Sequence, residues 1–172
     1  MKTIEIKLYK FSELSEDAKQ KAIENLYDCN LNFDWWDVMY EDAENIGLKI
    51  NSFDLDRNRH AKGEFLLSAA EVAQNILNEH GEMCETYKTA KNFLSDFNPL
   101  FADYLDEASE NYESSELENQ MLELETEFLN SLLEDYSILL QNEYEYLCSE
   151  EAIIETINNA NGYEFTEDGE IY

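Results

Sequence analysis

The chain has 172 residues, with 40 acidic and 11 basic side chains, and a formal net charge of −29. This charge repels nucleic acid and anionic lipid, so we expect neither as a direct partner. Apolar residues make up 44 % of the chain and aromatic residues 13 %, which excludes a disordered acidic chain and is enough for a folded core.

One proline and five glycines indicate a regular and mostly helical protein. The first residues alternate between apolar and polar types and lack the apolar region of a signal peptide. No apolar run approaches the ~20 residues that cross a membrane. Cys29, Cys84 and Cys148 show no paired spacing, so we expect free thiols in a cytoplasmic protein.

The first 60 residues predict two helices after a short strand. Residues 3–9 alternate like a half-buried strand. Ser15 is a good N-cap for a helix that ends near Asp28. Apolar residues over positions 33–46 fall within one helical arc, and Gly47 suits its left-handed C-terminal position. Trp36 lies inside that arc, which predicts core packing, and Trp35 lies at its edge.

A hairpin follows these helices. Residues 48–50 and 53–55 carry apolar side chains of different parity, which predicts one strand with a bulge near positions 51–52. Residues 56–60 read as a turn and residues 61–67 as the second strand. We expect this hairpin to pair with the strand over residues 3–9.

The next segment predicts two helices and then a break. Ser68 and Glu71 have the spacing of a capping box, and the helix they begin stops at His80. A further helix carries Met83, Tyr87, Ala90 and Leu94 on one face. The sequence Phe-Asn-Pro at 97–99 is the clearest break in the chain. We therefore expect a mixed α/β part over residues 1–97 and an acidic helical part over 98–172, packed as one compact unit.

The second part is read as three helices and a terminal hairpin. A short helix over 99–110 is followed by a helical pattern over 115–148, with a kink or break expected near Asn130 or Asn142. Ser149 caps a last helix, and Asp168-Gly169 predicts the turn of a hairpin over 163–172. The expected fold class is α+β, a small antiparallel sheet with packed helices followed by a mainly helical acidic C-terminal part.

Charge is segregated along the chain. Lys91 is the last basic residue, and residues 92–172 hold 22 acidic side chains and no basic one. On a helical wheel the acids of the long helix lie opposite its leucines, at a spacing too wide to copy one DNA strand without carboxylates from neighbouring helices. The acidic face predicted to bind a partner consists of Asp106, Glu110, Glu113, Glu116, Glu123, Glu127, Glu134 and Glu145.

Parts of the N-terminal half resemble a known group of proteins. The residues that carry the likeness are Lys10-Phe-Ser-Glu-Leu-Ser-Glu-Asp-Ala-Lys-Gln-Lys-Ala22, Asp34-Trp-Trp, Tyr40-Glu-Asp-Ala43 and Ile50-Asn-Ser-Phe-Asp-Leu-Asp56. They resemble small phage and prophage proteins that are loosely called antitoxin-like, mainly over residues 3–60. The resemblance implies an origin in a mobile element and the cytoplasm of a host, and it brings no catalytic motif.

Metal sites and enzyme motifs find little support. Asp54 and Asp56 begin like a calcium loop, but Arg59 stands where the turn glycine belongs and Phe65 where the bidentate glutamate belongs. His80 and Cys84 are separated by Gly81, which interrupts the helix that would align them as zinc ligands. No phosphate-binding, dinucleotide-binding or hydrolase motif occurs. We expect no metal, no cofactor and no enzyme activity.

The leading hypothesis is a phage-encoded, non-enzymatic inhibitor that imitates the charge of DNA. It would block the basic nucleic-acid-binding groove of a host defence protein of the restriction or CRISPR type. Two alternatives remain open, an antitoxin-like protein that binds a basic toxin and a carboxylate or metal-dependent enzyme. A solvated acidic face without a partner is the plainest reading, and the binding surface would then be sought around Trp35 and Tyr40.

Overall fold

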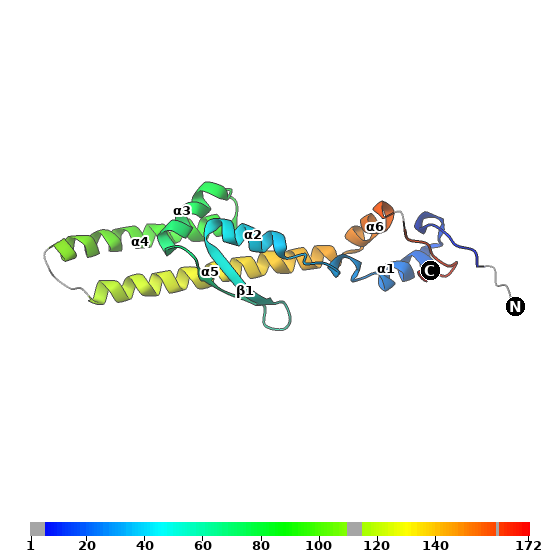
Figure 1. Ribbon diagram of the computed structural model, residues 1–172, viewed down its shortest axis with the longest axis horizontal. Coiled ribbons are helices and arrows are strands. Elements are labelled where there is room, and N and C mark those ends of the chain that lie inside the picture. Colours follow the sequence, from blue (N-terminus) through cyan, green and yellow to red (C-terminus); the bar gives the residue numbers. More distant parts are fainter. Residues whose placement is uncertain (1–5, 110–114, 161) are drawn as a thin grey trace. The chain divides into compact units, whose positions relative to one another are not determined.

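The computed structural model of the chain describes residues 6–109, 115–160 and 162–172, and it confirms the α+β class with a mainly helical second half (Figure 1). The elements in chain order are the 3-10 helix η1 (Phe11–Glu13), α1 (Glu16–Asn25), the 3-10 helix η2 (Cys29–Leu31), α2 (Asp37–Ile46), β1 (Leu48–Asp54), β2 (His60–Phe65), α3 (Ala69–Glu79), α4 (Glu85–Ser109), α5 (Ser115–Leu147) and α6 (Glu150–Asn159).

These elements gather into two compact units, which we call the terminal unit and the middle unit. The terminal unit contains Met1–Trp35 and Asn142–Tyr172, and the middle unit contains Trp36–Gln141. The units therefore divide at positions other than the break expected over 97–99. That break is absent from the backbone, because α4 continues through Pro99 to Ser109.

Aromatic packing explains why the helix continues through Pro99. A proline inside a helix removes one backbone hydrogen bond and costs about 3 kcal/mol. Phe93 and Phe97 are buried before it, and the ring of Phe101 stacks on Phe97 at a centroid distance of 5.8 Å after it. These contacts hold both sides of the proline against the same core, so tertiary packing outweighs the local penalty.

In the middle unit, β1 and β2 form an antiparallel hairpin. Ile50 pairs with Gly63 and Ser52 pairs with Lys62, so the register shifts between Ile50 and Ser52. The bulge predicted from the change of parity is thereby confirmed. Gly47, which precedes β1, has φ 92° as expected for the residue that ends α2.

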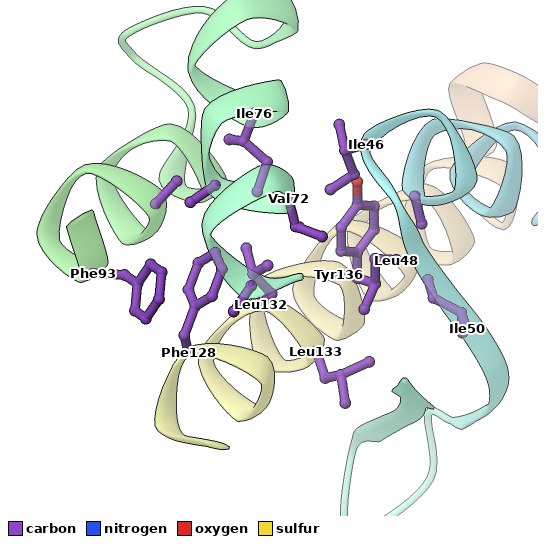
Figure 2. Close-up of a cluster of buried hydrophobic side chains, with 14 of the residues drawn as sticks. Ile46, Leu48, Ile50, Val72, Ile76, Phe93, Phe128, Leu132, Leu133 and Tyr136 are labelled. Atoms are coloured by element: carbon purple, nitrogen blue, oxygen red, sulfur yellow. The ribbon is translucent and has the colours of Figure 1, made fainter. Parts of the chain in front are cut away.

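The core of the middle unit is built from all its helices and the hairpin (Figure 2). The rings of Phe93 in α4 and Phe128 in α5 stack at 4.3 Å with an interplanar angle of 8°. Tyr136 is fully buried, and its hydroxyl donates a 2.7 Å hydrogen bond to Asp42 Oδ2. The aliphatic side chains that surround these rings include Ile46, Leu48, Ile50, Val72, Ile76, Leu132 and Leu133.

Local signals placed three helix starts correctly. The hydroxyls of Ser15, Ser68 and Ser149 accept hydrogen bonds from the backbone N–H three residues later, so each is the predicted N-cap. The long helix α5 is continuous over its 33 residues, without the break expected near Asn130 or Asn142.

The helix expected over 33–46 begins later than predicted, and this reverses the expected roles of the two tryptophans. α2 starts at Asp37, so residues 33–36 do not share its periodicity. Trp35 is buried in the terminal unit, with its ring 5.9 Å from that of Tyr144. Trp36 is only partly buried in the middle unit, beside Phe53. Met83 also precedes its expected helix and is exposed.

The terminal unit joins the two ends of the chain around Phe165, which has 0 % of its surface exposed. Phe165 packs with apolar residues of α1 and α6 and forms a single antiparallel bridge with Tyr9. The strand expected over residues 3–9 is therefore reduced to one bridge at Tyr9. Residues 6–8 have no strand structure, and residues 3–5 lie outside the described part.

The terminal hairpin is confirmed as a turn but not as two strands. Gly169 has φ 84°, and a Cβ atom there would lie 2.1 Å from the Ala18 carbonyl oxygen, so both conformation and contact require glycine. Phe165 forms an isolated bridge with Ile171. Ile171 is 43 % exposed, whereas Phe165 is fully buried.

Candidate functional site

The acidic surface is organised by the antiparallel pair α4 and α5, which lie side by side in the middle unit (Figure 1). We call residues 92–133 the arm. Two contacts fix its register, the stacking of Phe93 on Phe128 and a 3.1 Å hydrogen bond from the Tyr104 hydroxyl to Glu118 Oε1. The arm holds eleven acidic residues and no basic residue.

Three of the predicted partner-binding residues form one stripe on the arm. Glu116, Glu123 and Glu127 are exposed and lie on the face of α5 opposite its buried side, as the helical wheel predicts. Asp96 and Asp103 are exposed on the neighbouring side of α4. We call these five residues the acidic edge.

A shallow groove shows that the two helices contribute to the acidic edge together. It is lined by Thr89, Asn92, Phe93 and Asp96 of α4 and by Leu124, Glu127, Phe128 and Ser131 of α5. Thr89, which lines the groove, donates a 2.7 Å hydrogen bond to Asp135 Oδ2. Burial raises the pKa of Asp135, the hydrogen bond from Thr89 offsets part of that rise, and the carboxylates of Glu85 and Glu134 add to it.

Glu134 differs from the other members of the predicted stripe. It is exposed, but its carboxylate forms a hydrogen-bonded ion pair with Arg59, whose Nε also donates a 3.1 Å hydrogen bond to the Ser137 hydroxyl. Glu134 therefore has a basic partner, although residues 92–172 contain no basic residue. Arg59 lies just after the turn between β1 and β2, so the pairing depends on the tertiary fold and not on neighbours in sequence.

The remaining predicted residues are distributed differently from the stripe. Asp106 is exposed on α4 within the arm. Glu145 is exposed on the part of α5 that belongs to the terminal unit, so it is outside the arm. Glu110 and Glu113 lie outside the described residues.

A polar network inside the middle unit involves one of the residues considered for metal binding. His80 Nδ1 and Thr86 Oγ1 are 2.7 Å apart, and His80 Nε2 lies 3.6 Å from Asp42 Oδ1. Asp42 also accepts the hydrogen bond from Tyr136. Burial raises the pKa of Tyr136, and the hydrogen bond to Asp42 raises it further. The network ties α2, α3, α4 and α5 together. His80 Nδ1 has its hydrogen-bond partner in Thr86, whereas Nε2 is buried without a hydrogen-bond partner among the described residues.

The residues considered as calcium ligands form a turn. Asp54 Oδ1 accepts a 2.8 Å hydrogen bond from the backbone N–H of Asp56, which is an Asx turn at the end of β1. Within residues 6–109, 115–160 and 162–172, no group of three or more His, Cys, Asp or Glu side chains is arranged to hold a metal ion.

The sequence did not reveal a second edge of the arm. Phe101, Leu105 and Leu122 are exposed, with 42 %, 52 % and 62 % of their surfaces accessible. Phe101 and Leu105 belong to the segment 99–110, which was expected to form a short separate helix. Their exposure could be recognised only once the register of α4 on α5 was known.

No helix in the described part of the chain is both long and apolar enough to cross a membrane. The resemblance of residues 3–60 to small phage proteins stays a prediction. Comparison of the chain with protein-family models, with curated proteins and with solved structures finds no match.

Proposed function

We propose that this protein is a phage-encoded, non-enzymatic inhibitor whose arm imitates the charge of DNA. The arm would occupy the basic nucleic-acid-binding groove of a host defence protein of the restriction or CRISPR type. The proposal is supported by the density of carboxylates on the arm, and the resemblance of the N-terminal residues supplies its phage context.

The two helices together approach the charge density of a DNA duplex. The register set by Tyr104 and Glu118 places Asp96 beside position 126 and Glu107 beside position 115. Nine described acidic residues, from Asp96 to Glu127, therefore span about 12 helical steps, or ~18 Å. This is about one carboxylate per 2 Å, against about one phosphate per 1.7 Å of duplex axis.

Such an array is attractive to a surface that normally binds phosphates. A groove gains affinity for DNA when its Lys and Arg side chains neutralise phosphates and release counterions. The same groove gains affinity for a fixed array of carboxylates, and the long-range field also accelerates association. The stacked phenylalanines between α4 and α5 hold this array in a defined register.

The test uses a matched pair of charge variants and a panel of purified restriction and CRISPR-type nucleases. The arm variant carries Asp103→Asn, Glu116→Gln, Glu123→Gln and Glu127→Gln. The control variant carries Glu24→Gln, Glu151→Gln, Glu155→Gln and Glu167→Gln, four exposed residues of the terminal unit. Both variants therefore lose the same net charge.

We expect the unaltered protein to inhibit DNA binding by its target nuclease, with inhibition relieved by added duplex DNA. The arm variant should inhibit more weakly and with a shallower dependence on salt, and the control variant should inhibit like the unaltered protein. Equal weakening by both variants would show that only net charge matters. Tight binding of duplex DNA by the protein itself would exclude the mimic.

The antitoxin-like alternative is favoured by one observation, the exposed apolar side chains on the arm. A protein that imitates only phosphates does not need them, whereas an interface with a small basic toxin buries such residues. Recovery of proteins bound from a host lysate distinguishes the two candidates, because the toxin would be a single small protein that duplex DNA does not displace.

A further inference from the structure

Three exposed apolar residues lie on the same side of the arm. Phe101 and Leu105 are four residues apart on α4, so they lie one above the other on one helix face. Leu122 on α5 is four residues after Glu118, whose carboxylate accepts the hydrogen bond from Tyr104. We call Phe101, Leu105 and Leu122 the apolar edge.

The apolar edge and the acidic edge are on opposite sides of the helix pair. The groove described above places Asp96 of α4 and Glu127 of α5 on one side. At ~100° per residue, Phe101 and Leu105 lie on the side of α4 away from Asp96 and Asp103. The same rotation places Leu122 on the side of α5 away from Glu116 and Glu127.

Phe101 is exposed yet held in place. Its ring stacks on Phe97 with an interplanar angle of 13°, and Phe97 stacks on Phe93 in the core. Phe101 is thus the outer end of a row of stacked rings. A partner that covers this ring pays little conformational entropy for fixing it.

The negative charge around the apolar edge indicates what kind of partner would bind there. Glu118 and Glu125 border the apolar edge on α5, and the arm contains no basic residue. A second copy of this chain would bring another eleven acidic side chains to the contact, so repulsion opposes self-association. A partner segment with both apolar and basic side chains satisfies the apolar edge and its acidic border together.

We propose that the apolar edge docks a cationic amphipathic helix of the partner protein. The inference rests on the proposed function for the basic character of the partner, and it adds an apolar contact that charge imitation does not supply. Two packed antiparallel helices accept a third helix at an axial distance of about 8–10 Å. Its apolar residues at helical spacing would contact Phe101, Leu105 and Leu122, with Lys or Arg beside Glu118 and Glu125.

The test uses a synthetic peptide as the probe. It consists of Lys and Leu over about five helical turns, with Leu at positions i, i+3, i+4 and i+7. A peptide of the same composition with the Leu positions scrambled has equal charge and no apolar stripe. Binding to the full-length protein is followed by fluorescence anisotropy at several salt concentrations.

Variants separate apolar docking from charge. The apolar-edge variant carries Phe101→Ser, Leu105→Ser and Leu122→Ser. Its control carries Val38→Ser, Met83→Ser and Leu139→Ser, three other exposed apolar residues of the middle unit. Leu122→Ser alone is a milder change for the case in which the triple variant folds poorly, and circular dichroism reports folding of each.

We expect the amphipathic peptide to bind roughly tenfold or more tightly than the scrambled peptide, and the apolar-edge variant to lose that preference. The control should keep it, and Leu122→Ser alone should reduce it. Equal affinity for both peptides, or an unaltered preference in the apolar-edge variant, would overturn the inference and leave the charge proposal standing. A stable dimer of the unaltered protein that the apolar-edge variant abolishes would also overturn it, because the edge would then be covered by a second copy.

Discussion

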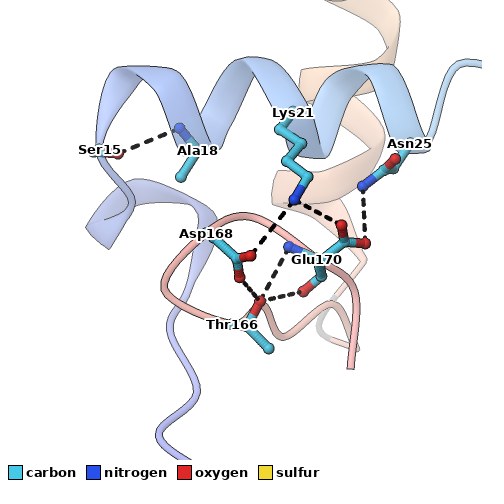
Figure 3. A network of polar contacts seen from close by, with 7 residues as sticks. All are labelled: Ser15, Ala18, Lys21, Asn25, Thr166, Asp168 and Glu170. Atoms are coloured by element: carbon cyan, nitrogen blue, oxygen red, sulfur yellow. Dashed lines mark hydrogen bonds and ion pairs between the residues drawn. The ribbon is translucent and has the colours of Figure 1, made fainter.

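The terminal unit and the arm use their acidic residues in opposite ways. The terminal unit has 16 acidic and 5 basic residues, and two of its lysines, Lys10 and Lys21, pair with carboxylates near the opposite end of the chain. Figure 3 shows Lys21 of α1 between Asp168 and Glu170, with Nζ to oxygen distances of 3.5 and 2.7 Å. The arm has eleven acidic residues and no lysine or arginine.

This difference separates two roles of negative charge in one protein. In the terminal unit the carboxylates help to position the end of the chain: the hydrogen bond to Glu170 is the main reason that the pKa of Lys21 is raised, and Asn25 donates a further bond to Glu170. In the arm the fold is held by stacked rings, and the carboxylates of the acidic edge are exposed to solvent. Charge that contributes little to folding is the charge most available to a partner.

The largest expected effect concerns the rings that hold the arm. Phe128→Ala removes the stack on Phe93 and the contact with Phe65, and we expect it to lower the free energy of unfolding by about 3–5 kcal/mol. Leu124 is only partly buried, so Leu124→Ala should cost at most about 2 kcal/mol. Urea unfolding followed by circular dichroism measures both. Equal losses of unfolding free energy in the two variants would mean that the stacked rings are not the main contacts that stabilise the arm.

A comparable loss is expected in the terminal unit. Deletion of residues 163–172 removes the buried Phe165, at a cost of about 3–5 kcal/mol, although the protein keeps 36 of its 40 acidic residues. Phe165→Ala leaves the carboxylates in place and should reproduce most of the loss. If the truncated protein is equally stable but no longer binds its partner, the segment is a contact surface and not a structural one.

Salt should act mainly through the arm. Screening relieves repulsion among its closely spaced carboxylates, so the melting temperature should rise from low to high ionic strength. The arm variant described above should start from a higher melting temperature at low salt and respond less to added salt. The control variant in the terminal unit should keep most of the salt response. A flat response in the unaltered protein would mean that the arm is already compensated.

The opposite response to salt is expected around Lys21. Lys21→Gln removes a partly exposed cation that pairs with two carboxylates, so it should destabilise the protein slightly at low ionic strength. The difference from the unaltered protein should vanish at high salt, because exposed pairs are screened. Lys7→Gln, at another exposed lysine of the terminal unit, serves as the control in thermal melts. A deficit that persists in high salt would indicate a packing role for the Lys21 side chain.

The smallest expected effect is a pH dependence of stability caused by Asp135, which accepts a hydrogen bond from Thr89. Its pKa is raised in the folded protein, so the folded state holds the proton more tightly than the unfolded chain. Stability from this group is present at low pH and is lost as pH rises through the raised pKa. Asp135→Asn should therefore stabilise the protein near pH 7, by less than about 1 kcal/mol because the side chain is partly solvated.

The control for this prediction is Asp96→Asn, which removes an exposed carboxylate from the same groove. Melting temperatures of both variants are compared with the unaltered protein between about pH 4 and 7. Asp135→Asn should gain most at the upper end of this range and little at the lower end. A gain that is the same at every pH would assign the effect to packing.

The sequence was sufficient where the physical cause is local. Ser15, Ser68 and Ser149 cap helices through hydrogen bonds three residues away, and the bulge in β1 follows from the parity of neighbouring side chains. The stripe of Glu116, Glu123 and Glu127 also follows from a single helix, because one periodicity fixes which face is buried. These features need no knowledge of the rest of the fold.

Predictions from the sequence were wrong or missing where contacts between distant segments of the chain determine the structure. Pro99 was read as a break because its cost is local, whereas the rings that outweigh it pack on Phe128. The ion pair of Glu134 with Arg59 could not be predicted because Arg59 is remote along the chain. The exposure of Phe101 could not be predicted because it depends on the position of α5 beside α4. The apolar edge could not be predicted for the same reason.

The contacts between the ends of the chain have a consequence for biosynthesis. Asn25 and Glu170 are hydrogen-bonded although they are 145 positions apart. At the usual pace of translation, about 5–20 residues per second, roughly 7–29 s pass between synthesis of α1 and synthesis of its partner segment. During that time Leu14, Ala18 and Ile23 lack Phe165, which covers them in the finished protein. The nascent chain thus exposes an apolar surface around α1 that favours aggregation, and a chaperone would act on this surface.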